Sequence, residues 1–155
     1  MYFETTMFNY YIDAERDFHP DVVAMFEAAG RGAFTGFTST YAVDELTAAP
    51  DPKRTAMLAL IEKYNLRLIH FSPEIERLAD AYITEGIVPA QKRIDALHIA
   101  SASVSALDYI VTLNFKHMNK QKTKLLVSPV NLLRGYRGIT ICSPMEVDYE
   151  NKEHD

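Results

Sequence analysis

The chain has 155 residues and a formal net charge of -5, with 48% hydrophobic and 24% charged residues. These values are typical of one compact domain with a sizeable core, and they exclude an intrinsically disordered chain. The negative net charge excludes nucleic-acid binding through the global electrostatic field, so any such contact needs a local basic patch. No apolar run approaches the roughly 20 residues that span a bilayer.

The cysteine content and the first residues bear on the cellular compartment. The single cysteine, Cys142, excludes a disulfide within the chain, and the strand-like residues Met1 to Phe3 are not preceded by a basic and apolar leader. We therefore expect a cytoplasmic protein without membrane association.

The first half of the chain predicts two strands and three helices. Residues 1 to 4 predict a short apolar strand, followed by a helix from Pro20 to Ala29 with the proline in its first turn. Residues 36 to 39 predict the second strand. A helix over residues 41 to 49 ends at a Pro-Asp-Pro turn, and an amphipathic helix covers residues 53 to 64.

The second half continues this alternation. Residues 66 to 71 predict the third strand, and Ser72-Pro73 opens a helix that ends before Gly86. A helix rich in small residues follows from Lys92 to Ala106. Residues 109 to 112 predict a buried fourth strand. A short helix starts at Ser128-Pro129 and stops at Gly135 or Gly138, and residues 139 to 142 predict the fifth strand.

This order of elements predicts the fold class. Alternating strands and helices are typical of an α/β domain with a doubly wound parallel sheet, here of about five strands, flanked by helices on both faces. We place this single domain at residues 1–146. Residues 147–155 are acidic and without pattern, so we expect them to fray.

One local basic patch lies between the fourth strand and the last helix. It falls in the stretch from residue 115 to 124, which has the character of an exposed loop, and it comprises Lys116, His117, Lys120, Lys122 and Lys124. The patch could contact a nucleic-acid backbone. The alternative interpretation is a loop that is simply solvated.

Four polar residues lie close to the predicted carboxyl ends of strands, where doubly wound sheets bind ligands. Glu4 ends the first strand and Asn114 follows the fourth, while Glu45 and Asp95 lie on helices next to the sheet. Three clustered carboxylates repel one another unless a cation neutralises them. Oxygen ligands indicate Mg²⁺ or Mn²⁺, and such a site suits phosphodiester hydrolysis. Any one of the four, taken alone, is better explained as an unrelated surface group.

Several segments resemble a known family. Tyr2-Phe3-Glu4-Thr5-Thr6 resembles the opening strand and Asp-Thr-Asn/Ser signature of PIN domains, in a Glu-Thr-Thr variant. The segment from Asp95 to Ala100 is similar to the helix that carries the family's third acid. Thr112 to His117, Val130 to Tyr136 and Ser143 to Glu146 resemble segments of one subgroup. The matches run in order from Tyr2 to Glu146, whereas any single one would be weak.

The resemblance implies a PIN fold and a metal-dependent endoribonuclease, specifically a VapC-like toxin that a cognate antitoxin inhibits. Under this hypothesis Glu4, Glu45 and Asp95 hold one or two Mg²⁺ or Mn²⁺ ions, and Asn114 helps to position the attacking water. Glu4 stands where the family more often has Asp, and Asn114 where many members have Asp. Leu113 replaces the subgroup's usual Trp, which we interpret as a change in packing.

Further residues have two interpretations each. Thr5 could bond a carboxylate or the scissile phosphate, or it could form the turn after the strand. Lys116 and His117 are placed to meet a backbone phosphate. Asn131 suits a substrate contact or a helix-start cap. His98 could orient Asp95, although a satisfied core histidine is the more common case. For the aromatic residues near the site we favour packing over base stacking; they are Tyr2, Phe8, Tyr10, Tyr11 and Tyr41.

Other functions remain open at this stage. A catalytically degenerate PIN domain that binds RNA or protein without cutting is the main alternative, given Glu4 and Asn114. A receiver domain shares the sheet type, but Phe71-Ser72-Pro73 stands where a receiver needs its phosphoacceptor Asp. The expected partners are an RNA substrate, a cognate antitoxin and a second copy of the chain. The identity of the RNA does not follow from the sequence.

Overall fold

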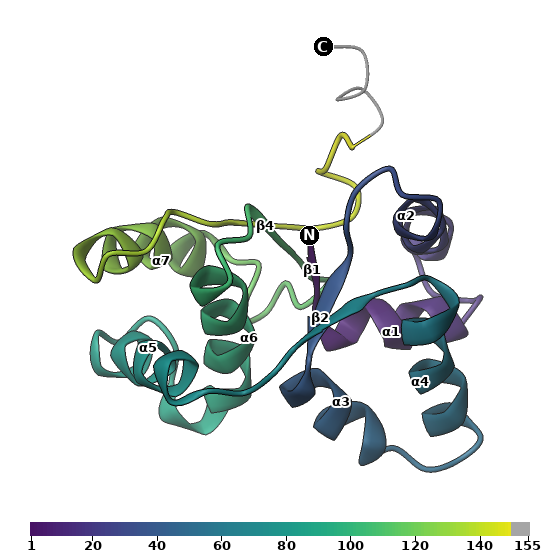
Figure 1. Ribbon diagram of the computed structural model, residues 1–155, viewed down its shortest axis with the longest axis horizontal. Coiled ribbons are helices and arrows are strands. Elements are labelled where there is room, and N and C mark those ends of the chain that lie inside the picture. The colour runs from purple at the N-terminus through teal and green to yellow at the C-terminus, as the bar shows by residue number, and fades with distance from the viewer. Residues whose placement is uncertain (150–155) are drawn as a thin grey trace.

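The computed structural model describes residues 1–149, in which strands and helices alternate along the chain (Figure 1). The strands are β1 (Tyr2–Phe3), β2 (Phe37–Ser39), β3 (Arg67–Ile69), β4 (Tyr109–Val111) and β5 (Thr140–Cys142). The helices are α1 (Thr5–Ile12), α2 (His19–Gly30), α3 (Thr40–Thr47), α4 (Lys53–Lys63), α5 (Pro73–Thr84), the 3-10 helix η1 (Ala90–Lys92), α6 (Arg93–Val104) and α7 (Gln121–Leu133).

The five strands form one sheet in the order β3-β2-β1-β4-β5, and every pairing is parallel. The chain builds outward from β1 to β3, then returns to pair β4 with the other side of β1. The winding direction therefore reverses between β1 and β4. Figure 1 shows α1, α2 and α4 on one side of the sheet and α5, α6 and α7 on the other. The predicted doubly wound α/β fold is confirmed.

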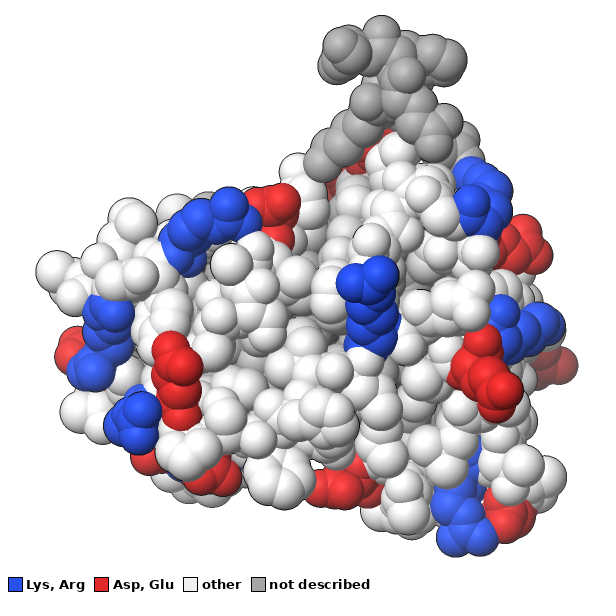
Figure 2. Space-filling view, in the orientation of Figure 1, with Lys and Arg blue, Asp and Glu red and all other residues white. Residues whose placement is uncertain are grey.

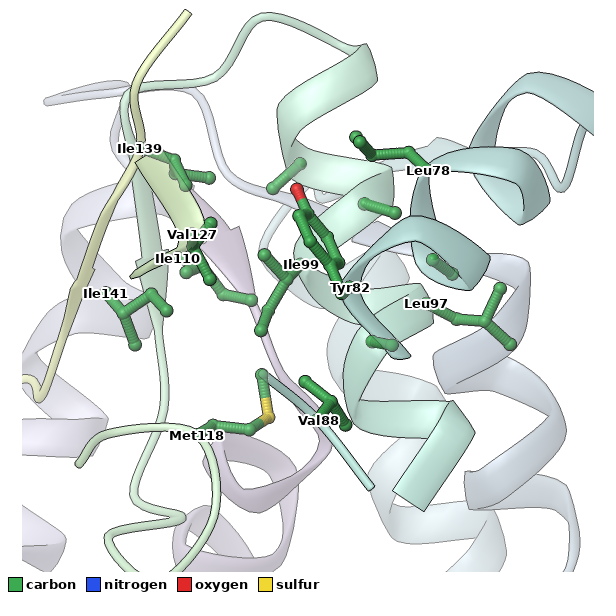
Figure 3. Packing of buried hydrophobic residues seen from close by; sticks show 14 of the residues in the cluster. Leu78, Tyr82, Val88, Leu97, Ile99, Ile110, Met118, Val127, Ile139 and Ile141 are labelled. Atoms are coloured by element: carbon green, nitrogen blue, oxygen red, sulfur yellow. The ribbon is translucent and has the colours of Figure 1, made fainter. Parts of the chain in front are cut away.

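The core lies in two layers because successive residues of a strand point to opposite faces. Tyr2 belongs to the cluster beneath α5, α6 and α7, whereas Phe3 belongs to the cluster on the other face. Ile110 and Val111 of β4 divide in the same way. Figure 3 shows the first cluster, where side chains of these three helices meet those of β4 and β5.

Helix α6 is buried over most of its length. Every residue from Asp95 to Ser103 is buried, which includes two groups that titrate near neutral or acidic pH, Asp95 and His98. The alanines and serines of this helix have short side chains and permit close packing against its neighbours. The polar side chains of α6 must therefore find partners inside the protein.

Helix α1 was not predicted from the sequence. Its residues Thr5–Ile12 are mostly threonine and aromatic residues, which have modest helix propensity. A local cap and tertiary packing stabilise it: the Glu4 side chain accepts a hydrogen bond from the Thr6 backbone N–H as an N-cap, and Met7 and Phe8 are fully buried. Packing and capping outweigh intrinsic propensity here.

The predicted start of the last helix at Ser128-Pro129 is wrong, because α7 begins at Gln121. The Ser128 hydroxyl does not cap a helix; it bonds both the N–H and the carbonyl of Ile139 just before β5. Pro129 lies inside α7 on its exposed face. Proline has no backbone N–H, so the carbonyl one turn earlier has no helical donor, and on the exposed face water can bond it instead. Lys122 and Lys124 consequently lie on a helix rather than in a loop.

The first residues of the predicted tail, 147–149, form no helix or strand, but two of them contact the core. Val147 and Tyr149 pack against the second core cluster, and the Tyr149 ring meets that of Phe34 edge-on. The remainder of the predicted tail, residues 150–155, lies outside the described residues.

The surface shows how the charge is distributed. On the face in Figure 2, acidic and basic side chains are interspersed and lie mainly near the margins, so this face has no single positive field. Within residues 1–149, no helix combines the length and the apolar character needed to span a bilayer.

Candidate functional site

The site begins where β1 and β4 end, at the point where the winding direction reverses. Glu4 follows β1 directly, and its backbone N–H bonds the carbonyl of Val111 in β4. The hydroxyl of Thr112, the next residue after β4, donates to Oε1 of Glu4 at 2.8 Å. In doubly wound sheets this position is where ligands bind.

Glu4 is held through only one of its two carboxylate oxygens. Besides Thr112, the backbone N–H and the hydroxyl of Thr6 both donate to Oε1, at 2.9 and 2.5 Å. The same Thr6 hydroxyl accepts from the N–H of Leu113, which ties the loop after β4 to the start of α1. Among the described residues, none donates to Oε2. Glu4 is 3% exposed, so its second oxygen is available within a nearly closed site.

Glu45 of α3 shows the same one-sided pattern. The Thr5 hydroxyl donates to its Oε1 at 2.6 Å, and Nε2 of His98 lies 2.5 Å from the same oxygen. Its Oε2 has no hydrogen-bond partner within residues 1–149. Burial acts to raise the pKa of Glu45, but the hydrogen bond and charge of His98 and the Thr5 hydroxyl outweigh it and leave the pKa lowered.

His98 has a different partner from the one considered in the sequence. It lies one turn after Asp95, yet its imidazole contacts Glu45 on α3 through Nε2 and Tyr2 on β1 through Nδ1, the latter at 2.5 Å. Burial acts to lower the pKa of His98, whereas the bond to Glu45 and the charges of the surrounding acids raise it, and the net direction is upward. His98 is thus part of the site.

Asp95 completes the acidic group, and no donor within residues 1–149 bonds its carboxylate. It is 7% exposed, and its buried Oδ2 has no hydrogen-bond partner in the described part of the chain. Its pKa is raised to about 6, first by burial and then by the charge of Glu4, with a smaller contribution from Glu45; His98 and Lys92 act in the opposite direction. The three predicted acids are therefore electrostatic neighbours.

Asn114 follows β4 two residues after Thr112, and its amide oxygen is used within its own loop. Oδ1 accepts from the backbone N–H of His117 at 3.1 Å, and the Asn114 N–H bonds the Thr112 hydroxyl. The Asn114 carbonyl accepts from Met118 and Asn119. These bonds shape the loop after β4, so Asn114 connects to Glu4 only through Thr112.

Basic residues border the acidic group. Partial burial lowers the pKa of His117, and the charges of Lys92, Lys116 and Lys120 lower it further. Lys92 also acts on Asp95, so this lysine is an electrostatic neighbour of both groups. No ion pair within residues 1–149 engages Lys92, Lys116 or Lys120. Lys92 was not among the residues predicted from the sequence, although its position three residues before Asp95 was a usable signal.

Asn131 is not brought to this site, and both interpretations of it were wrong. It is fully buried in the middle of α7, where it cannot cap the helix start. Its Oδ1 accepts from the Tyr82 hydroxyl, while its amide group donates to Ser103 and to the Arg137 carbonyl. Both N–H groups of the amide are used within the protein, and its oxygen is buried.

The aromatic residues near the site mainly pack, as favoured from the sequence. Phe8 and Tyr11 contact the ring of Phe26 edge-on. Tyr2 is the exception, because it is fully buried and bonds both His98 and the Ser39 hydroxyl, the latter at 2.6 Å. Burial is also the main cause of its raised pKa.

The donor set suits a hard divalent cation. Glu4, Glu45 and Asp95 offer only oxygen, and each has at least one oxygen without a partner in the described residues. The pKa of Asp95 is raised by burial and, after it, by the charge of Glu4, and a bound cation would offset both effects. Their present side-chain positions do not form a ready metal-binding group, nor do any other three Asp, Glu, His or Cys side chains in the described residues. Side-chain adjustment would therefore accompany binding.

No protein-family model matches the chain, and no curated protein matches it either.

Proposed function

We propose that this protein is an endoribonuclease that depends on Mg²⁺ or Mn²⁺ and hydrolyses phosphodiester bonds in RNA. The observation that carries the proposal is the group of three buried or half-buried acids at the reversal point of the sheet, each with an oxygen that no group in residues 1–149 bonds. The resemblance to PIN domains supports the same activity. The substrate class depends on that resemblance and on the adjacent lysines.

Each residue of the site has a distinct role in this proposal. Glu4, Glu45 and Asp95 would hold the cation, which when bound lowers the pKa of a water and stabilises the leaving oxygen. Thr5, Thr6 and Thr112 orient the carboxylates through the hydrogen bonds described above. Asn114 shapes the loop that presents the basic residues, and this is a more indirect role than placing the water.

The basic border supplies the contacts to the RNA backbone. Lys92, Lys116 and His117 would meet phosphate oxygens next to the scissile bond, where positive charge positions the strand without reading its sequence. Because these lysines have no acidic partner within the described residues, a phosphate would not have to displace one.

We further propose that the protein acts as the toxin of a toxin–antitoxin pair and forms a homodimer. Leucines on the outer face of α7 support a protein partner: Leu125, Leu132 and Leu133 are 61%, 65% and 88% exposed. Leu125 and Leu132 are seven residues apart, which places them on the same side of the helix, and large exposed apolar patches often mark protein interfaces. Light scattering of the purified chain, alone and with a candidate antitoxin, measures both assemblies.

The proposal is tested by cleavage of a labelled, partly single-stranded RNA in Mg²⁺ or Mn²⁺, using protein freed of any co-purifying partner. We expect cleavage that EDTA abolishes and that Asp95→Asn reduces at least a hundredfold, because the variant removes a metal-binding charge. Asp44→Asn, an exposed acid beside Glu45 on α3, is the matched control and should retain activity.

Either of two results contradicts the proposal. Cleavage that persists in EDTA or in Asp95→Asn would show that the acids do not form the active site. An absence of both cleavage and Mn²⁺ binding would favour the alternative, a binding module that does not cut.

A further inference from the structure

A line of buried hydrogen bonds lies behind Glu45 and has no part in the roles assigned so far. It runs from Ser39 at the start of α3, through Tyr2 on β1 and His98 on α6, to Glu45 near the end of α3. The three separations are 2.6, 2.5 and 2.5 Å. Ser39, Tyr2 and His98 are each 0% exposed, so water cannot replace any of these partners.

One placement of the hydrogens satisfies every group in this line. The backbone N–H of Ala42 donates to the Ser39 oxygen as the N-cap of α3. The Ser39 hydroxyl then donates to Tyr2, and the Tyr2 hydroxyl donates to Nδ1 of His98. Nδ1 thereby becomes an acceptor, which places the hydrogen of the neutral ring on Nε2, facing Glu45. In the charged ring both nitrogens carry a hydrogen, so Nδ1 donates to the Tyr2 oxygen and Nε2 still donates toward Glu45.

The line closes on the helix from which it started. Ala42 and Glu45 are three residues apart on α3, and the bonds between them pass through β1 and α6. Without the Tyr2 hydroxyl, the neutral ring could place its hydrogen on Nδ1 and turn a lone pair toward the carboxylate, which would repel it. The hydroxyl therefore selects the form of His98 that can hold Glu45.

We infer that Tyr2 and His98 are positioning residues, which fix Oε1 of Glu45 so that Oε2 is left for the cation. This inference rests on the proposed metal site. Groups that hydrogen-bond metal-binding side chains without touching the metal commonly change metal affinity by about 10- to 100-fold when they are substituted. Tyr2, which touches neither Glu45 nor the cation, acts through His98 alone.

The experiment compares two tyrosine-to-phenylalanine variants. Tyr2→Phe removes the hydroxyl of the line, whereas Tyr82→Phe removes an equally buried hydroxyl from the same core cluster, one that bonds Ser103 and Asn131. We expect Mn²⁺ affinity, measured by electron paramagnetic resonance, to fall about tenfold in Tyr2→Phe and to stay unchanged in Tyr82→Phe. Unchanged affinity in Tyr2→Phe, or an equal loss in both variants, would overturn the inference.

A second measurement separates this inference from the proposed function. The ¹⁵N shifts of the His98 ring report which nitrogen carries a hydrogen, and they can be recorded on the metal-free wild-type chain. We expect a hydrogen on Nε2, and a ring with hydrogen on Nδ1 alone would overturn the inference. If the wild-type chain binds no Mn²⁺, the proposed metal site fails, and the ring shifts of wild type and Tyr2→Phe still decide whether Tyr2 sets the tautomer.

Discussion

Helix α6 takes part in two buried polar networks that differ in how completely the protein satisfies them. Near its end, Ser103 joins Tyr82 and Asn131 in what we call the closed network, where the Asn131 amide has a partner for both its oxygen and its nitrogen. Near its start, Asp95 and His98 belong to what we call the open network, together with Glu4 and Glu45.

The open network leaves acceptors without donors. Glu4 and Glu45 each bond through one oxygen only, and within residues 1–149 the buried Oδ2 of Asp95 has no partner. Buried polar groups are normally satisfied, because an unpaired one costs about 1 to 3 kcal/mol. The closed network therefore serves the stability of the fold, whereas the open network keeps its unused oxygens at the expense of stability, as functional sites often do.

The largest effect is expected from breaking the closed network. Asn131→Ala should lower the free energy of unfolding by about 4 kcal/mol, because several buried groups would each lose a partner at about 1 to 3 kcal/mol. Urea denaturation measures the change. Mn²⁺ affinity should not alter, and a selective loss of metal binding or RNA cleavage by folded Asn131→Ala would show that the two networks are not separate.

Removing the charge of Asp95 in the open network should raise the free energy of unfolding, whereas Asn131→Ala should lower it. Because the folded-state pKa of Asp95 is raised to about 6, its stabilising contribution is present below the ordinary Asp value and is lost as the pH rises through about 6. Asp95→Asn should therefore stabilise the metal-free protein by about 3 kcal/mol above pH 7.

The pH dependence provides the check on that prediction. Near pH 4 the wild-type carboxyl is protonated in the folded protein, so the difference from Asp95→Asn should largely disappear. Thermal unfolding of both proteins from pH 4 to 8 gives the comparison. A variant that is destabilised, or a difference that does not depend on pH, would mean that the folded protein does not raise the pKa of Asp95.

A bound cation should stabilise the wild-type chain, because it would offset the repulsion of Asp95 by Glu4 and Glu45. Mn²⁺ at one hundred times its dissociation constant should raise the free energy of unfolding by about 2.7 kcal/mol. The effect should be lost in Asp95→Asn and kept in Asp44→Asn, and calorimetry with and without EDTA measures it. Equal stabilisation of all three proteins would place the binding elsewhere.

The smallest effect is expected at the basic border of the open network. Lys116→Ala should weaken RNA binding about two- to fivefold and reduce the slope of log affinity against log salt by about 0.7, since one phosphate contact is lost. Fluorescence anisotropy over a salt series measures both. Lys63→Ala, whose ammonium lies over the Tyr64 ring on α4, is the control, and an equal change there would contradict a local phosphate site.

The parallel α/β fold could be predicted from the sequence, because hydrophobic periodicity indicates strands and helices and their alternation indicates a parallel sheet. Glu4, Glu45 and Asp95 were selected as one group mainly on the resemblance to PIN domains, since periodicity alone does not distinguish them from unrelated surface acids. Thr5, which bonds Glu45, was also identified, as one of two open interpretations.

Only the tertiary structure decided how these side chains are satisfied. The start of α7, the formation of α1, the pairing of His98 with Glu45 rather than Asp95, and the burial of Asn131 all depend on segments distant in the chain. A hydrogen-bond partner is chosen by packing between elements, and a buried polar group takes whichever donor or acceptor that packing supplies. For this reason, spacing along one helix could not identify the partner of His98.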